Sequence, residues 1–405
     1  MVLQKQILTS DFVKMMPKIK IFSFFSGCGF LDLGFENTAF DIVFVNEIFA
    51  PFKEAYIYAR QLLEISEPEY GYFADSLVSL TEENGKIYLQ ELVKDSRINS
   101  NFIGFIGGPP CPDFSIGGKN RGKNGDNGKL SDAYIELICQ QQPDFFVFEN
   151  VKGLWSTKKH RAFYEEIKCK LYKYGYIITE RLINAIEYGV PQDRYRIILI
   201  GFRCTLVKDK GFNIGYSKVI PEKIFPWEKY VLYPQNQVFS YGWPQTNPFV
   251  ENSEINCPTG IPEELTVEHW FRQNNVVYHP NSKDYFQPRA GRIKFEAVAE
   301  GDARKKSYKR LHRWRYSPTA CYGNNEVHLH PYKVRRLSVS EALAIQSLPE
   351  KFALPNNMTL TNKFKTIGNG VPYLAAKGVA NTLLSFLNME KINYQEEISY
   401  QLELP

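Results

Sequence analysis

Residues Ile19–Phe30 read IKIFSFFSGCGF, an apolar run that ends in a glycine turn. The run covers residues 19–25 and is short enough for one strand, so it predicts a buried strand that enters a loop. Gly27 and Gly29 permit backbone conformations that other residues avoid. The stretch therefore predicts the first strand of an α/β domain, with a loop at its end that a ligand can approach closely.

The same pattern recurs along the first half of the chain. Further strand-like runs cover 41–47, 102–108, 144–150, 177–184 and 195–202. Helical patterns cover 51–64, where Pro51 stands near the start, 131–142, where Ser131 can cap the helix, and 160–174. Strands that alternate with helices in this way predict an α/β fold with a mostly parallel sheet.

Helical signals return near the end of the chain. Ser338 and Glu341 form a capping box ahead of an apolar stretch. Pro372 is placed to open a last helix that runs to about residue 387. We expect these helices to belong to the first domain.

Composition places the chain among globular proteins, with 405 residues, 44% hydrophobic and 23% charged. Seven cysteines without a CxxC pair argue against both a disulfide framework and a zinc site, and for a reducing compartment. No apolar run reaches the roughly 18 residues that a membrane span needs. We therefore expect a soluble, cytoplasmic protein with no metal and no membrane partner.

Residues 207–332 lose the alternating pattern and are rich in Pro, Asn, Tyr and Trp, so they predict a second, smaller and irregular domain. The expected organisation is an extension at 1–18, a first domain at 19–206 plus 333–390, the second domain at 207–332, and a tail at 391–405. Within the second domain, residues 289–315 carry ten Lys or Arg and three acidic residues, a net charge of +7. Such a segment suits phosphate binding, and a solvated charged face is the alternative.

Residues 107–118 read GGPPCPDFSIGG and set Cys111 among three prolines, with glycine pairs at both ends. Proline fixes φ and stiffens the chain, whereas glycine lets the stiff piece move or admit a close neighbour. This setting suits a presented nucleophile, and a turn that happens to contain cysteine is the alternative.

An acidic residue, Glu47, ends the second strand-like run twenty positions after Gly27. Its carboxylate can accept two ribose hydroxyls, which favours a nucleoside-type cofactor over a simple tight turn. The dinucleotide fingerprint GxGxxG is not met, because Asp32 stands where the third glycine belongs.

Five motifs follow in order: GGPPCPDFS (107–115), FENVKG (148–153), GVPQDRYR (189–196), RRLSVSEALAIQSLP (335–349) and KTIGNGVPYLAAK (365–377). In this order the chain resembles the DNA cytosine-5 methyltransferases of bacterial restriction-modification systems, over residues 20–203 and 333–386. The resemblance implies a doubly wound sheet, the S-adenosylmethionine-dependent methyltransferase fold, with a small DNA-recognition domain inserted before the last helices. It also implies methyl transfer to C5 of a flipped-out cytosine.

The resemblance assigns roles to individual residues. Cys111 matches the nucleophile, Glu149 the acid at the base, and Arg194 and Arg196 an arginine pair. The positions that match the surroundings of S-adenosylmethionine are Phe25, Gly27, Gly29, Glu47, Asp75, Pro109, Leu130 and Asn369. Three departures stand out: Phe30 replaces a usual glycine, Pro112 follows the cysteine, and Asp75 aligns less securely.

Double-stranded DNA is the implied partner of a protein that we expect to be a monomer. We expect Lys305, Lys306, Lys309 and Arg310 to contact phosphates, and Trp314 and Asn324 to contact bases. A cognate restriction endonuclease that acts on the same site without stable contact is left open. A tRNA cytosine-5 methyltransferase of the same fold is the first alternative, and the larger second domain and the absence of a CFT tripeptide count against it. A catalytically silent DNA-binding relative is the second, and the intact catalytic positions count against that.

Overall fold

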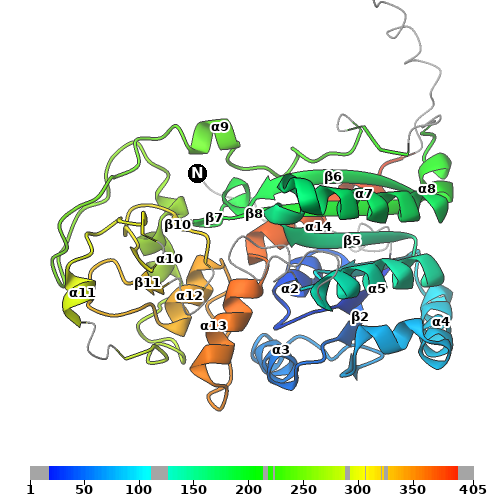
Figure 1. Ribbon diagram of the computed structural model, residues 1–405, viewed down its shortest axis with the longest axis horizontal. Helices are drawn as coiled ribbons and strands as arrows, with labels where there is room; N and C mark the ends of the chain where they lie inside the picture. Colours follow the sequence, from blue (N-terminus) through cyan, green and yellow to red (C-terminus); the bar gives the residue numbers. More distant parts are fainter. Residues whose placement is uncertain are drawn as a thin grey trace, which may run out of the picture.

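The computed structural model describes residues 18–110, 126–212, 218–221, 224–287, 292–305, 307–320, 322 and 327–390. Its central feature is a seven-stranded sheet (Figure 1). The strands are β1 (Ile19–Phe24), β2 (Phe40–Asn46), β3 (Tyr72–Phe73), β4 (Phe102–Gly107), β5 (Phe145–Val151), β6 (Tyr176–Asn184) and β8 (Tyr195–Arg203).

The strand order across the sheet is β3-β2-β1-β4-β5-β8-β6. The pairs β1–β2, β1–β4, β2–β3 and β4–β5 are parallel. Only β8 runs against its neighbours, pairing antiparallel with both β5 and β6. The predicted mostly parallel sheet is therefore confirmed.

Helices cover both faces of the sheet, so the fold is doubly wound. One face packs against α2 (Phe30–Glu36), α3 (Ala50–Leu62), α8 (Cys204–Asp209) and α14 (Tyr373–Leu387). The other packs against the 3₁₀ helix η1 (Leu77–Thr81), α4 (Glu83–Ile98), α5 (Asp126–Gln141), α6 (Lys152–Ser156) and α7 (Lys158–Lys173). Side chains along a strand point to opposite faces of the sheet and so pack against both helix layers. In β1, Ile19 and Ile21 face the first layer, and Phe22 and Phe24 face the second.

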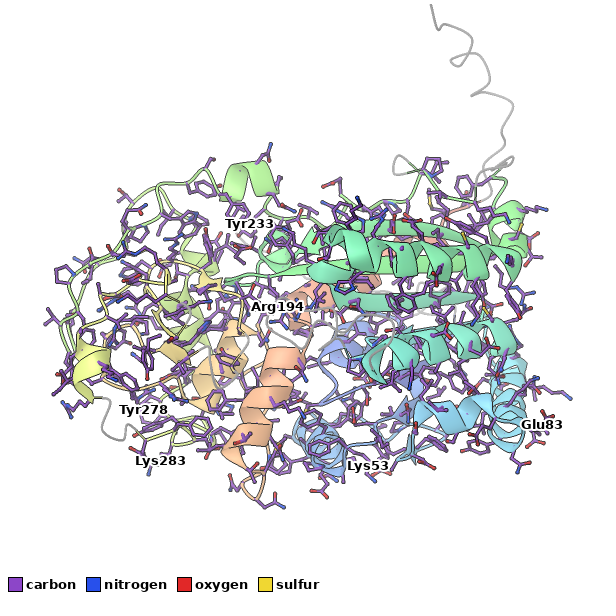
Figure 2. All side chains as sticks on the ribbon, in the orientation of Figure 1. Lys53, Glu83, Arg194, Tyr233, Tyr278 and Lys283 are labelled. Atoms are coloured by element: carbon purple, nitrogen blue, oxygen red, sulfur yellow. The ribbon has the colours of Figure 1, made fainter. Side chains whose placement is uncertain are left out.

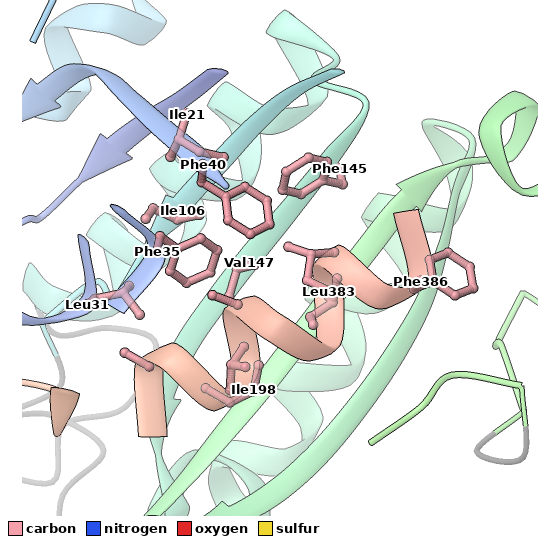
Figure 3. Close-up of a cluster of buried hydrophobic side chains, with 14 of the residues drawn as sticks. Ile21, Leu31, Phe35, Phe40, Ile106, Phe145, Val147, Ile198, Leu383 and Phe386 are labelled. Carbon is pink, nitrogen blue, oxygen red and sulfur yellow. The ribbon is translucent and has the colours of Figure 1, made fainter. Parts of the chain in front are cut away.

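The C-terminal helix α14 closes the first layer. Figure 3 shows Leu383 and Phe386 of this helix together with Val147, Ile198 and Phe145 of the sheet, and all five belong to one buried cluster. The ring of Phe386 stands 4.6 Å from that of Phe202 on β8. Helix α14 therefore packs into the same core as β1, although the two elements lie far apart in the sequence.

The second part of the molecule lies beside the sheet, on the left of Figure 1. It contains α9 (Gln235–Val238), η4 (Glu263–Leu265), α10 (Val267–Gln273), α11 (Arg292–Glu296) and the short strands β9 (Tyr308–Arg310), β10 (Ser317–Pro318) and β11 (Val327–Leu329). Two helices, α12 (Val339–Ile345) and α13 (Leu360–Asn369), stand between it and the first part. We call this second part, from Leu232 to Tyr332, the recognition region, after the DNA-recognition domain that the sequence resemblance implies there.

Its boundary lies later than the predicted residue 207. Val207, Phe225 and Trp227 pack into the core of the first domain, because apolar side chains after β8 still cover the sheet. At the other end, α12 shares a core with α10 through Ala344 and Ile345.

Several local predictions can be compared with the structure. The capping box of Ser338 and Glu341 is confirmed at the start of α12. The prediction that Ser131 caps a helix is wrong, because α5 begins at Asp126 and Ser131 is buried inside it. Helices α4 and α13 were not predicted. Within the described part of the chain, no helix combines the length and apolarity needed to cross a membrane.

Candidate active site

The carboxyl ends of β1, β2, β4 and β5 lie at one edge of the sheet, and the order of connection reverses between β1 and β4. In open α/β sheets, ligands bind at such a switch point, in the loops that follow the strands. The predicted residues Gly27, Glu47, Pro109 and Glu149 all belong to or follow these strand ends.

The loop after β1 is held in left-handed backbone conformations, with φ of 54° at Phe25, 57° at Gly27 and 79° at Gly29. A Cβ on Gly29 would stand 2.4 Å from the Arg60 guanidinium, so only glycine fits there. Phe30, which replaces a usual glycine, is buried and stacks edge-on against Phe352, with Gly370 packed on its ring. Its side chain thus fills the core between α2 and the end of α13.

Glu47 binds the same loop from the end of β2. One carboxylate oxygen accepts a hydrogen bond from the Gly27 amide at 2.9 Å, and the other accepts one from the Phe49 amide at 2.8 Å. Burial raises the pKa of Glu47, although both backbone hydrogen bonds work in the opposite direction. Each oxygen keeps a second lone pair, so the carboxylate can still accept from a ligand.

A buried network beneath the loop was not predicted from the sequence. Asp32 of α2 accepts hydrogen bonds from Ser23 and Tyr56, while Arg60 stacks on Tyr56 and pairs with Glu36 at 2.7 Å. The sequence offered one sign of this network, which is that the acidic residue Asp32 stands at the third glycine position of the GxGxxG pattern. This network fixes the side of the loop that faces the core.

The remaining predicted cofactor positions lie around this edge. Asp75 is exposed after β3, and its main-chain carbonyl accepts from the side chain of Asn46 at 2.9 Å. Pro109 is buried, Leu130 is half-buried in α5, and Asn369 is exposed at the last position of α13.

Glu149 is a buried carboxylate at the end of β5. The Arg196 Nε atom of β8 lies 2.7 Å from Glu149 Oε1, because the antiparallel pairing sets Arg196 opposite Val151. Burial raises the pKa of Glu149, and the charges of Arg196 and Arg194 only partly oppose that rise. A Cβ on Gly108 would stand 2.6 Å from Glu149 Oε2, so the chain leading toward Cys111 passes directly over this carboxylate.

The two arginines of the predicted pair have different surroundings. Arg196 lies beside Glu149, whereas the Arg194 guanidinium is buried and donates to the main-chain carbonyls of Ala320, Gly368 and Gly370. Figure 2 shows Arg194 near the middle of the molecule, between the sheet and the recognition region.

Two predicted DNA contacts must be corrected. Arg310 is 0% exposed and donates to the carbonyls of Phe295, Val298 and Lys333, among others, so it holds the recognition region together. Trp314 is 2% exposed, and its indole donates to the Ile255 carbonyl at 2.7 Å. Neither side chain reaches the surface where DNA could contact it.

Three other members of the basic segment, Lys305, Lys309 and Arg315, are at least partly exposed. Lys305 is exposed and Lys309 is half-buried. Arg315, half-buried, lines a cavity of about 140 Å³ together with Asp193 and Tyr316, and its guanidinium lies 5.2 Å from the Tyr316 ring. The predicted residues Cys111, Lys306 and Asn324, and the departure Pro112, lie outside the described residues. No group of His, Cys, Asp and Glu suited to a metal ion occurs among the residues that are described.

The sequence of the chain matches a known family. The model of C-5 cytosine-specific DNA methylases matches residues 19–385. The chain belongs to this family. It is a DNA cytosine-5-methyltransferase, in agreement with the resemblance seen in the sequence motifs.

Individual relatives cover most of the chain. It is 56% identical to the Type II methyltransferase M.NmeDI of Neisseria meningitidis serogroup C, over 91% of this chain and 84% of that protein. It is 30% identical to M.FnuDI of Fusobacterium nucleatum, over 90% of this chain and 95% of that protein.

Solved structures share the fold at lower identity. An Escherichia coli prophage protein described as a putative DNA modification methyltransferase aligns with a TM-score of 0.59 and 20% identity, over 91% of this chain and 99% of that one. The Dnmt2 methyltransferase of S. pombe aligns with a TM-score of 0.54 and 14% identity, over 91% of this chain and 97% of that one. Both comparisons support the doubly wound methyltransferase fold.

The corrected role of Arg310 can be tested by measuring stability. Arg310→Ala would leave several buried carbonyls unpaired, at roughly 1–3 kcal/mol for each lost partner. We expect the free energy of unfolding in urea to fall by about 3 kcal/mol or more. Lys305→Ala, at an exposed site, should change it by less than about 0.5 kcal/mol. Equal stability of the two variants would contradict the structural role.

Proposed function

We propose that the enzyme transfers the methyl group of S-adenosylmethionine to C5 of a flipped-out cytosine in a specific double-stranded DNA sequence, through a covalent bond between Cys111 and C6. The observation that carries this proposal is the buried Glu149–Arg196 pair beneath Gly108. Cys111 follows three positions later in the chain. An acid and a cation thus meet at the end of β5, and the expected nucleophile stands close to Gly108 in the sequence.

The chemistry requires these groups because C5 of cytosine is a poor nucleophile. Attack of a thiolate on C6 would turn the ring into an enamine whose C5 can take a methyl group. Loss of the C5 proton to water would then expel the thiolate from C6 and restore the aromatic ring. The negative charge that develops on the ring must be relieved. Glu149, with its raised pKa, can share a proton with ring atom N3, and Arg196 can donate toward O2.

The residues around the first loop fit a nucleoside-type cofactor. Glu47 offers a buried carboxylate at the end of β2, and the left-handed loop brings main chain to the same place. We infer that Gly27, Gly29 and Glu47 hold S-adenosylmethionine, with Phe25, Asp75, Pro109, Leu130 and Asn369 around it. When bound, this cofactor supplies the methyl group.

A cytosine inside a duplex is out of reach of a side chain, so the target base must leave the stack. The glycines around Cys111 allow its loop to open for DNA, and the prolines keep the centre of the loop stiff. The recognition region would hold the duplex through Lys305 and Lys309, as the sequence suggested, and Arg315 would replace Arg310 and Trp314 as a candidate contact.

The names of the relatives suggest the biological setting. M.NmeDI and M.FnuDI are Type II methyltransferases, and we propose that this enzyme likewise belongs to a Type II restriction-modification system and protects host DNA. In that setting it would act in the cytoplasm as a monomer, and a cognate endonuclease would act on the same DNA site without stable contact.

The covalent mechanism predicts a trapped complex. DNA with 5-fluorocytosine at the target should form a stable adduct with the enzyme, because fluorine cannot leave C5 as a proton does. Cys111→Ser should form no adduct and transfer no methyl group, as measured by denaturing electrophoresis and by label transfer. Cys204→Ser serves as the control and should behave as the parent enzyme does. Methylation by Cys111→Ser, or a preference for tRNA over DNA, would contradict the proposal.

The cofactor assignment predicts a loss of affinity at the end of β2. Glu47→Ala should weaken S-adenosylmethionine binding by about 1.5–3 kcal/mol, the range for hydrogen bonds to a charged group. Titration calorimetry of the DNA-free enzyme measures this directly. The matched control is Glu69→Ala, a half-exposed carboxylate paired with Lys20. An unchanged dissociation constant for Glu47→Ala would show that the cofactor binds elsewhere.

Contacts between lysines and DNA phosphates predict that DNA affinity depends on salt concentration. If Lys305 and Lys309 each neutralise a phosphate, replacing both with alanine should reduce the slope of log K against log salt by about 0.9 for each contact. The loss should appear on cognate and scrambled duplexes alike. Lys170→Ala on α7, where Asp132 and Glu136 already pair with the lysine, is the control. If the double variant keeps the same slope of log K against log salt as the parent enzyme, DNA binds at another surface of the protein.

A further inference from the structure

Arg194 joins three parts of the chain that lie far apart in sequence. Its side chain is 1% exposed. One terminal nitrogen donates to the carbonyl of Ala320 at 2.8 Å, and the other donates to the carbonyls of Gly368 at 2.6 Å and Gly370 at 3.1 Å. A planar guanidinium has five N–H donors in a fixed fork, so it can hold several acceptors in one geometry.

The contact with Ala320 belongs to a larger seam between the sheet domain and the recognition region. The Ala320 amide donates to the side chain of Gln192 at 3.1 Å, and the Thr319 hydroxyl donates to the Asp193 carbonyl at 2.6 Å. Residues 192–193 and 317–318 also form a short parallel pair, β7 with β10. The seam therefore fixes where the recognition region attaches to the catalytic sheet.

The contacts with Gly368 and Gly370 reach toward the candidate cofactor loop. Gly370 packs so closely on Phe30 that an added Cβ would stand 2.2 Å from the ring. The Thr366 hydroxyl donates to Cys28 Sγ at 2.9 Å. The end of α13 thus packs against the first loop. The Arg194 guanidinium binds the main chain at that same end of α13.

We propose that Arg194 is a positioning residue that holds the end of α13 against the cofactor loop and the recognition region against β7. This role differs from the cytosine contact that the sequence suggested, for which Arg196, at 2.7 Å from Glu149, is the candidate. The inference rests on the proposed function, because it requires S-adenosylmethionine to bind at the first loop.

The two roles differ in what they change before DNA binds. A residue that contacts only the flipped cytosine has no effect on cofactor affinity in the free enzyme. A residue that sets the end of α13 changes that affinity, since its loss lets the segment carrying Asn369 shift away from the loop.

Titration calorimetry of the DNA-free enzyme with S-adenosylmethionine distinguishes these two roles of Arg194. Arg194→Lys keeps the charge but loses the fork, and it should weaken cofactor binding by about tenfold or more, the scale of one lost hydrogen bond to a charged group. Arg196→Lys is the matched control: cofactor affinity should stay within about twofold, while single-turnover methyl transfer falls by about a hundredfold. Cofactor affinity of Arg194→Lys within twofold of the parent enzyme would overturn the proposal.

A milder variant covers the case in which Arg194→Lys does not fold, as judged by its thermal unfolding. Gln192→Ala leaves Arg194 in place but removes the side-chain oxygen that lies 3.4 Å from its Nη1 atom. It should weaken DNA-free cofactor binding by about threefold or more, and an unchanged affinity would again overturn the proposal. If the parent enzyme itself binds no S-adenosylmethionine, the proposed function fails, which is a different result from equal binding by parent and variants.

Discussion

The antiparallel pairing of β8 with β5 is the constraint on which the candidate site depends. It brings Arg196 opposite Val151 and leaves Glu149 on the same face of the sheet, so that two residues far apart in sequence meet at 2.7 Å. Because β8 is antiparallel to β5, its first residues lie beside the carboxyl end of β5. The first residues of a parallel strand would lie at the opposite edge of the sheet, away from Glu149. Both side chains are largely buried, so the charge of each is compensated by the other. Removing one side chain would leave the other charge buried without a partner. The chain at Gly108 can then pass directly over Glu149.

Much of this fold could be predicted from the sequence, because the strands are short apolar runs that end in turns. The runs at 19–25, 41–47 and 144–150 correspond closely to β1, β2 and β5. Helices α4 and α13 were missed although their apolar residues recur at helical spacing, with Leu89 and Val93 buried on α4 and Phe364 and Ile367 buried on α13. The domain boundary was placed too early because Phe225 and Trp227 follow irregular chain and yet fill the core.

The roles of the arginines could not be predicted in the same way. Sequence shows a charge, but only packing shows which partner it has. Arg310 and Arg313 look like members of a basic surface segment. One is enclosed by carbonyls, however, and the other is paired with Glu300 at 2.8 Å in the interior. Arg194 and Arg196 stand two residues apart in one motif, and the structure directs one toward main-chain carbonyls and the other toward a carboxylate.

The central claim is that Glu149 supplies a proton to the target base, and the pH dependence of a single turnover tests it most directly. Because burial raises the pKa of Glu149, the protonated form is present below that pKa and is lost as pH rises through it. The rate of methyl transfer in the parent enzyme should therefore fall on the alkaline side. In Glu149→Gln the rate should be lower by about 10²–10⁴-fold, and that alkaline fall should disappear. An alkaline fall of unchanged shape in Glu149→Gln, or a rate close to that of the parent enzyme, would contradict the claim.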